Sequence, residues 1–285
     1  MTPPTGTTRP RLSDALTRRY ADAPPVPDAL SQEQLLKLTF MAERGSVRAF
    51  KTDPIDQATL SFLSAVALAS PTKSDLQQRD IILIQEPTIK VRLIELMGTQ
   101  AWVKAAPTML VFCGNNRRQR LVHRLRGHPF ANDHLDAFFN SAVDAGIALS
   151  AFVTAAEAIG LGTCPISAIR NHAEAVCELL DLPDYAFPLA GLAVGWPAEA
   201  PEISPRLPLS VTLHVDRYEE SGLEDALEAY DAARASIQPY AKQRFTEDYG
   251  MADPYVWSED KARQYSKPER EQFGAFVRGK GFKLD

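Results

Sequence analysis

The feature that most constrains the fold is a long apolar stretch, "SAVDAGIALSAFVTAAEAIG", at residues 141–160. A helix of this sequence is apolar on nearly all sides, and such helices lie in the interior of a protein or in a membrane. Asp144, Glu157 and the many alanines argue against a membrane span. We therefore expect a buried central helix, whose small side chains would also suit a subunit interface.

Composition narrows the class of protein. The chain has 285 residues, of which 45% are hydrophobic and 24% charged, enough for one large domain or two small ones with a real core. The net charge of −5 argues against a general nucleic-acid binder. Three cysteines without CxxC spacing, and five histidines without HxH or HExxH spacing, predict neither a disulfide framework nor a metal site. The first twenty residues lack the apolar core of a signal peptide, which predicts a cytoplasmic protein.

The order of helical and extended patterns favours an α+β fold, because the two mix without a strict βαβ rhythm. Residues 1–30 predict a flexible N-terminal arm with one short helix. Residues 31–285 predict a single domain, in which 221–285 form an extended C-terminal helical segment. The apolar periodicity predicts helices at 31–44, 56–70, 88–106 (broken near Gly98), 141–160 and 171–181, and strands at 79–86, 107–114 and 187–197.

Local signals mark several of these boundaries. Ser31 and Gln34 have the spacing of a capping box. Gly160 follows a helix rather than a strand, so it predicts a helix C-cap and not a dinucleotide-binding turn. Cys164 is better explained as a small buried thiol than as a nucleophile, because no histidine partner is in view.

The one basic run is "NNRRQRLVHRLRGH" at residues 115–128. Binding to single-stranded nucleic acid would favour interleaved aromatic side chains for stacking, and this run has none. We expect a solvated loop. The alternative, a nucleic-acid binder acting through residues 117–126, predicts salt-dependent binding to DNA or RNA.

Two arginines bracket a Gly-Ser step in "ERGSVRAF", residues 43–50. Cations near the C-terminus of the preceding helix would be favoured by the helix dipole. Alternatively, two guanidinium groups, a hydroxyl and an accessible backbone amide suit a phosphate. Both explanations stay open from these residues alone.

Six segments in a fixed order make the chain recognisable: "RGSVRAF", "SPTKSDLQ", "EPTIKVRLIELMGTQAWVKAAPTMLVFC", "GLGTCPISAIRN", "FPLAGLAVGWP" and "PRLP". Over roughly residues 35–285 the chain resembles the FMN-dependent nitroreductase superfamily, in its branch of NADPH-dependent nitroreductases and flavin reductases. The resemblance implies a mainly antiparallel sheet wrapped by helices. It also implies a homodimer that exchanges C-terminal segments and holds FMN at the subunit interface.

The resemblance also implies the residues that contact FMN. Arg44 and Ser46 match contacts to the phosphate and ribityl chain, and Arg48 matches a cation at the N1–O2 edge of the flavin. A backbone N–H of the segment around Ser167 is expected near flavin N5. The remaining matched positions are Thr72, Ser74, Gln77, Gln100, Pro165, Ile166, Ala168 and Arg206.

Three departures from the family pattern change these expectations. Gly45 stands within the first contact motif where a polar or basic residue is usual, and Ser204 stands where lysine is common. "ISAIR" replaces a frequent Gly-Gly pair. We therefore expect fewer phosphate contacts and a narrower space over the flavin.

The implied activity is that of an oxidoreductase that takes hydride from NADPH and passes two electrons to nitroaromatics, quinones or free flavin by a ping-pong mechanism. Arg48 would stabilise the negative charge that develops on the flavin. NADPH is expected over NADH because Arg170 and Arg263 are candidates for the 2′-phosphate, and Lys261 stands near Arg263. No nucleic acid or membrane partner is expected.

Two alternatives remain within flavin proteins. The same fold could carry out other flavin chemistry, such as reductive dehalogenation or consumption of the flavin. The chain could also be a non-enzymatic FMN-binding module. Reduction of a quinone by NADPH, or repeated bleaching and reoxidation of bound flavin, distinguishes these from the main interpretation.

Overall fold

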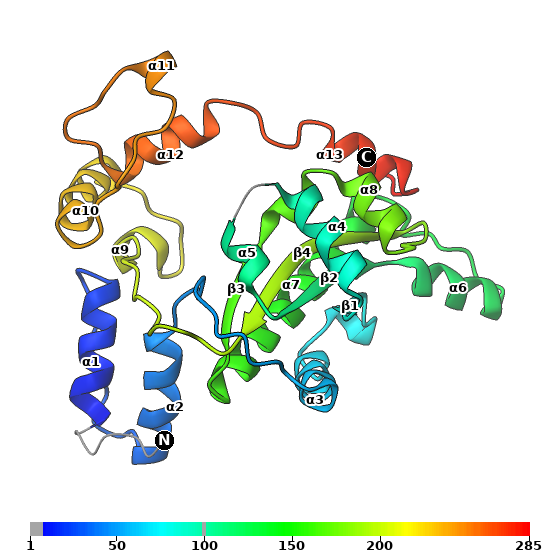
Figure 1. Cartoon of the computed structure of the whole chain (residues 1–285), viewed down its shortest axis with the longest axis horizontal. Coiled ribbons are helices and arrows are strands. Elements are labelled where there is room, and N and C mark those ends of the chain that lie inside the picture. The colour runs from blue at the N-terminus through cyan, green and yellow to red at the C-terminus, as the bar shows by residue number, and fades with distance from the viewer. Residues whose placement is uncertain (1–7, 99–100) are drawn as a thin grey trace. The chain divides into compact units, whose positions relative to one another are not determined.

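Residues 8–98 and 101–285 are described by a computed structural model (Figure 1). The chain forms two units, each made of two separate stretches of sequence. Unit 1 comprises Met1–Gly45 and Glu202–Glu269, and unit 2 comprises Ser46–Pro201 and Arg270–Asp285. The division into an arm at 1–30 and one domain at 31–285 stays a prediction.

Unit 2 is built on a four-stranded sheet with the order β1-β2-β4-β3. The strands are β1 (Arg79–Ile84), β2 (Thr108–Asn115), β3 (Gly162–Ile166) and β4 (Ala186–Gly195), and every neighbouring pair is antiparallel. This confirms the predicted α+β class with an antiparallel sheet. All eight residues of β2 are buried, because the strand is central and both faces of the sheet are covered.

Helices cover both faces of this sheet (Figure 1). On one face, α3 (Gln57–Leu68) and α7 (Leu135–Ala158) pack against Leu110 and Phe112 of β2. The opposite face carries Met109, Val111 and Cys113 of β2, which pack with the side chains of other helices. Those helices are α4 (Pro87–Met97), α5 (Ala101–Ala105) and α8 (Ala173–Leu179), together with the 3₁₀ turn η2 (Ser167–Arg170). A smaller cluster around Phe187 includes α13 (Phe273–Gly279) at the C-terminus.

Helix α7 confirms the predicted central helix but is not buried on all sides. Phe152 is fully buried and meets Phe112 edge-on, with 5.8 Å between ring centroids. Phe139 and Val143, however, are 60% and 41% exposed. The sequence prediction of burial all round is wrong for the single chain, because a helix that lies on a sheet buries only one stripe. Among the described residues, α7 is the one helix long and apolar enough to cross a membrane, a test that core helices also meet.

The predicted end signals are confirmed. Ser31 and Gln34 form the capping box of α2 (Gln32–Glu43). After α7, the N–H of Leu161 donates to the carbonyl of Ala156 at 3.1 Å, and Gly160 has a φ of 88°. These are features of a glycine-terminated helix.

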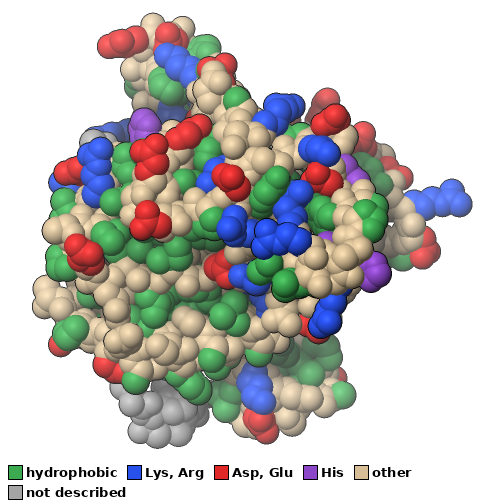
Figure 2. Space-filling view, turned by 90° about the vertical axis from the view of Figure 1, so that its right-hand side faces the viewer, with side chains coloured by type: hydrophobic (Ala, Val, Ile, Leu, Met, Phe, Trp, Pro, Cys, Tyr) green, Lys and Arg blue, Asp and Glu red, His purple; other side chains and the backbone are tan. Residues whose placement is uncertain are grey.

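One predicted loop is regular structure instead. The basic run contains helix α6 (Arg117–Arg126), which Arg118 anchors through an ion pair of 2.6 Å to Asp80. The prediction of a loop is wrong because this contact with Asp80, distant in sequence, stabilises a helix that arginine, leucine and glutamine permit without a buried face. Exposure is confirmed for the helix, since no residue of α6 is buried, but Asn115 and Asn116 at the start of the run are buried. In Figure 2, acidic and basic side chains lie among one another over the visible face.

The segment "GTCPIS" is also regular structure, although the sequence analysis predicts no strand there. It forms edge strand β3 followed by η2. Pro165 is compatible with β3 because an edge strand leaves one row of backbone groups without a ladder partner. The proline therefore concealed the strand in the sequence.

Unit 1 consists mainly of helices. Its longer helices are α1 (Thr8–Arg19), α2, α10 (Leu223–Ile237) and α12 (Trp257–Tyr265), and its short ones are α9 (Leu209–Thr212) and α11 (Thr246–Tyr249). Leu12 and Ala15 of α1 are 3% and 1% exposed and pack with Leu35 and Ala42 of α2. Ile203 completes this cluster, so α1, α2 and the residue at the start of the second stretch of unit 1 share one small core.

Candidate functional site

The polar loop that carries Thr72, Ser74 and Gln77 is held by a buried carboxylate. Asp144 of α7 is fully buried, and its oxygens accept the N–H groups of Lys73 and Gln78, each at 2.9 Å. Thr72 Oγ1 also accepts the N–H of Gln77 at 3.3 Å. The loop conformation therefore depends on one side chain from the central helix.

The same loop has an unusual backbone. Ser74 and Gln77 have φ values of 50° and 52°, and Asp75, between them, has 55°. Left-handed backbone at non-glycine residues costs free energy and persists where the surroundings hold it. Asp144 supplies that restraint, while the side chains of Ser74 and Gln77 stay exposed and available to a ligand. The sequence analysis did not predict that Asp144 holds this loop, although an acidic residue within an apolar helix could have indicated it.

The segment with Ser46 and Arg48 runs beside the end of the sheet in unit 2. The N–H of Val47 donates to the carbonyl of Thr163 at 2.9 Å. A side chain at Gly162 would meet Val47 at 2.7 Å, so glycine permits this close approach. Ser46 and Arg48 are exposed, and Arg48 lies 5.8 Å from the ring centroid of Trp102.

The residues predicted over the flavin ring follow directly from β3. Ile166 is buried in the core of unit 2 and fixes the end of the strand. Pro165 and Ser167 are exposed, and Ala168 is half-buried. Gln100, the other predicted contact of this region, lies outside the described residues.

Unit 1 contains the other predicted phosphate contacts. Arg44 is the C-cap residue of α2, and Arg206 is exposed. The structure places a further arginine beside them: Arg19 from the last turn of α1, which sequence reasoning did not select. Burial lowers the pKa of Arg19, and the positive charges of Arg206 and Arg44 lower it further.

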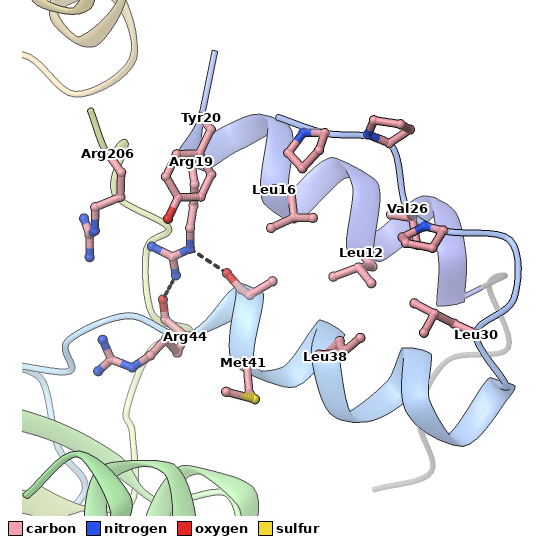
Figure 3. Close-up of a pocket in the computed structure, with 14 residues that line it drawn as sticks. Leu12, Leu16, Arg19, Tyr20, Val26, Leu30, Leu38, Met41, Arg44 and Arg206 are labelled. Carbon is pink, nitrogen blue, oxygen red and sulfur yellow. Dashed lines mark hydrogen bonds between the residues drawn. The ribbon is translucent and has the colours of Figure 1, made fainter. Parts of the chain in front are cut away.

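These arginines lie at one end of a pocket of about 460 Å³ within unit 1 (Figure 3). Leu12, Leu16, Leu30 and Leu38 line its other end. Three guanidinium groups that raise one another's electrostatic energy are a suitable donor set for an anion, because phosphate accepts charge-assisted hydrogen bonds from arginine. The residues of unit 1 therefore fit the phosphate group of a nucleotide-like cofactor.

The two candidates for a 2′-phosphate differ in environment. Arg263 is 4% exposed and donates to Glu259 Oε1 at 2.6 Å and to the carbonyl of Gly250 at 2.8 Å. A nucleotide would have to displace these contacts, so Arg170 is the better candidate for binding the 2′-phosphate. Arg170 is half-buried, donates to the carbonyl of Leu189, and lies 5.9 Å from the ring centroid of Phe273.

The cysteines are buried, as expected for Cys164. None of Cys113, Cys164 and Cys177 forms a disulfide. Burial raises the pKa of the Cys113 thiol well above its usual range and that of Cys177 to about 11. These two thiols are therefore protonated near neutral pH. Among the described residues, no group of histidine, cysteine and acidic side chains is arranged to hold a metal ion.

Unit 2 has an antiparallel sheet between helical layers, with exposed polar loops, and is therefore an α+β structure. Unit 1 contributes a cluster of arginines that suits a phosphate-bearing ligand. Two sequence profiles match this chain: Nitroreductase family over residues 41–196, and Nitroreductase family, C-terminal domain over residues 204–285. The chain belongs to the nitroreductase family.

Individual relatives agree with this membership. The chain is 32% identical over 250 residues to "FMN reductase [NAD(P)H]" of Bacillus subtilis, covering 86% of this chain and 97% of that protein. It is 35% identical over 187 residues to "Oxygen-insensitive NADPH nitroreductase" of Salmonella typhimurium, covering 65% and 75%. The solved structure of B. megaterium NfrA2 has a TM-score of 0.79 and 32% identity, covering 87% of this chain and 98% of that one.

The family profiles begin at residue 41, so helix α1 and the proline-rich segment after it lie outside them. Arg19, which lies beside the predicted phosphate contacts Arg44 and Arg206, therefore belongs to a part of the chain that the profiles do not include.

Proposed function

We propose that this protein is an FMN-dependent oxidoreductase that uses NADPH to reduce nitroaromatics, quinones or free flavin. The observation that carries the proposal is the match to nearly the full length of a B. subtilis protein named FMN reductase. The relative named NADPH nitroreductase supports the same electron donor. Bound FMN would supply the two-electron chemistry, so the chain itself needs to bind and orient rather than act as acid, base or nucleophile.

The proposed contacts follow the matched positions. In unit 1, Arg44 and Arg206 would bind the phosphate, and Ser204 and Gly45 lie in the same two segments. In unit 2, Arg48 would hold a positive charge at the flavin ring. The remaining proposed contacts in unit 2 are Ser46, Thr72, Ser74, Gln77, Pro165, Ile166, Ser167 and Ala168. The restrained loop under Asp144 supports a binding role for this set.

We also propose a cytoplasmic homodimer in which the C-terminal segment 221–285 contacts the partner. The exposed apolar side chains of Phe139 and Val143 on α7 support association, because a protein surface seldom leaves large neighbouring apolar side chains in water. Sedimentation equilibrium tests this proposal directly. A mass of two chains is expected, and a monomer at micromolar concentration would contradict it.

If one site serves both substrates in turn, NADPH and the acceptor should give parallel double-reciprocal lines. The reason is that the first product must leave before the acceptor occupies the same face. The measurement is the initial rate with NADPH and a quinone, each varied at several fixed concentrations of the other. Intersecting lines would indicate that both substrates bind together and would overturn the alternating mechanism.

Arg170→Ala should raise the KM for NADPH by about ten-fold while leaving the KM for NADH nearly unchanged, because only NADPH has the 2′-phosphate that a guanidinium would bind. Steady-state kinetics with each nucleotide measures the two values. Arg126→Ala is the matched control, since Arg126 is exposed on α6 and has no proposed role. Equal losses with both nucleotides would show that Arg170 does not recognise the 2′-phosphate.

A further inference from the structure

We propose that Arg19 supplies from the N-terminal arm the positive charge that Ser204 does not supply, making it a third cation for the phosphate of FMN. The inference rests on the proposed function, since it names a further residue of the same site. It differs from the family-derived contacts because Arg19 precedes the first residue matched by either family profile.

The position of Arg19 is fixed by several hydrogen bonds. Its Nε donates to the carbonyl of Ala42 at 2.7 Å, one Nη donates to the carbonyl of Arg44, and the other donates to the carbonyl of Ser204 at 3.4 Å. The carbonyl of Arg19 in turn accepts the backbone N–H of Arg206 at 2.7 Å. The residue therefore joins the two segments that carry the predicted phosphate contacts.

The side chain is buried where its charge has most effect. Arg19 is only 7% exposed, and the dashed lines in Figure 3 show its guanidinium group bonded to the backbone carbonyl groups of Ala42 and Arg44. These hydrogen bonds of its side chain go to neutral carbonyl groups, which do not neutralise its positive charge. A guanidinium group has five N–H donors, so carbonyl contacts do not exhaust its capacity to donate.

A second contact holds the arm on the same segment. The carboxylate of Asp22 accepts the N–H groups of Leu209 and Ser210 at 2.8 and 2.9 Å. Burial alone would raise the pKa of Asp22, but these hydrogen bonds outweigh it and lower the pKa. Asp22 is therefore ionised near neutral pH, and the arm stays attached on both sides of Arg206.

This arrangement accounts for the departure at Ser204. A lysine at this position would place a fourth cation beside Arg19, Arg44 and Arg206, where like charges repel one another. With Arg19 present, the neutral hydroxyl of Ser204 is the more favourable side chain. The arm thus supplies a positive charge that the side chain of Ser204 does not.

The test compares FMN with riboflavin, which has the same ring but no phosphate. Dissociation constants are measured by flavin fluorescence on flavin-depleted full-length protein at about 20 mM and about 500 mM salt. Arg19→Gln should weaken FMN by about ten-fold at low salt, less at high salt, and leave riboflavin within about two-fold. Arg9→Gln is the matched control, because Arg9 lies in the same arm and also donates to carbonyls, those of Val26 and Pro27 at 3.0 and 2.7 Å.

Ser204→Lys separates charge from structure. In the wild-type background it should tighten FMN by less than about three-fold, because Arg19 already occupies the position, whereas in the Arg19→Gln background it should restore most of the lost affinity. The comparison of Ser204→Lys with wild type tests the proposal even if Arg19→Gln fails to fold. If Ser204→Lys alone binds FMN about ten-fold or more tighter than wild type, no third cation is present in wild type and the proposal is overturned.

Equal weakening of FMN and riboflavin in Arg19→Gln would show a purely structural role and overturn the inference while leaving the proposed function intact. Wild-type protein that binds no FMN would overturn both. Selective weakening of FMN, with rescue by Ser204→Lys, supports the third cation.

Discussion

Asp144→Ala should lower the free energy of unfolding by about 3 to 5 kcal/mol and strongly weaken FMN binding, because it leaves the buried N–H of Gln78 and the partly buried N–H of Lys73 without their acceptor. The loop with Thr72, Ser74 and Gln77 would lose the restraint that holds its left-handed residues. Urea unfolding followed by circular dichroism measures the first effect, and FMN titration measures the second.

Asp231→Ala is the control for this prediction. Asp231 is also a buried carboxylate, and it accepts the N–H of Ser258 at 2.9 Å in unit 1. Its removal should cost stability without a selective loss of flavin. If Asp144→Ala binds FMN as tightly as wild type, the 72–78 loop is not part of the cofactor site.

Arg48→Ala should slow the bleaching of bound flavin by NADPH by about ten-fold to one hundred-fold, even when FMN is saturating. A fixed cation stabilises charge that develops during reaction more than it stabilises the starting state, so its loss affects the rate as well as binding. Stopped-flow absorbance at several FMN concentrations separates the two contributions.

Arg48→Lys provides the comparison because it keeps the charge and changes only its geometry. It should retain more of the rate than the alanine variant. Full recovery of the wild-type rate by Arg48→Ala at saturating FMN would mean that Arg48 only binds the cofactor.

Strong local signals predicted most of the elements correctly. The capping box at Ser31, the apolar pattern of β2 and the glycine after α7 each depend on residues close together in sequence, and each is confirmed. The predictions failed where an element depends on contacts between residues distant in sequence. Helix α6 is stabilised by partners such as Asp80, distant in sequence, and the strand containing Pro165 exists because it lies at a sheet edge.

The candidate site shows the same limit. Short motifs predicted Arg44, Arg48 and Arg206 as candidate contacts because these residues sit in recognisable segments. Asp144 and Arg19 were not among the predicted candidates because their contacts are tertiary: Asp144 reaches a loop about seventy residues away, and Arg19 reaches Ser204. No local pattern encodes either contact. The exposed half of α7 was missed because periodicity shows which residues are apolar but not what covers them.

The proposed function requires bound FMN, and the absorption spectrum of the purified full-length protein tests for it. We expect flavin bands at about one FMN per chain after reconstitution, and bleaching of those bands by NADPH without oxygen, because the cofactor carries the chemistry. Reoxidation by a quinone should restore the bands. A protein that stays colourless and binds no added FMN would contradict the central claim, and bound flavin that NADPH fails to bleach would indicate a non-enzymatic module.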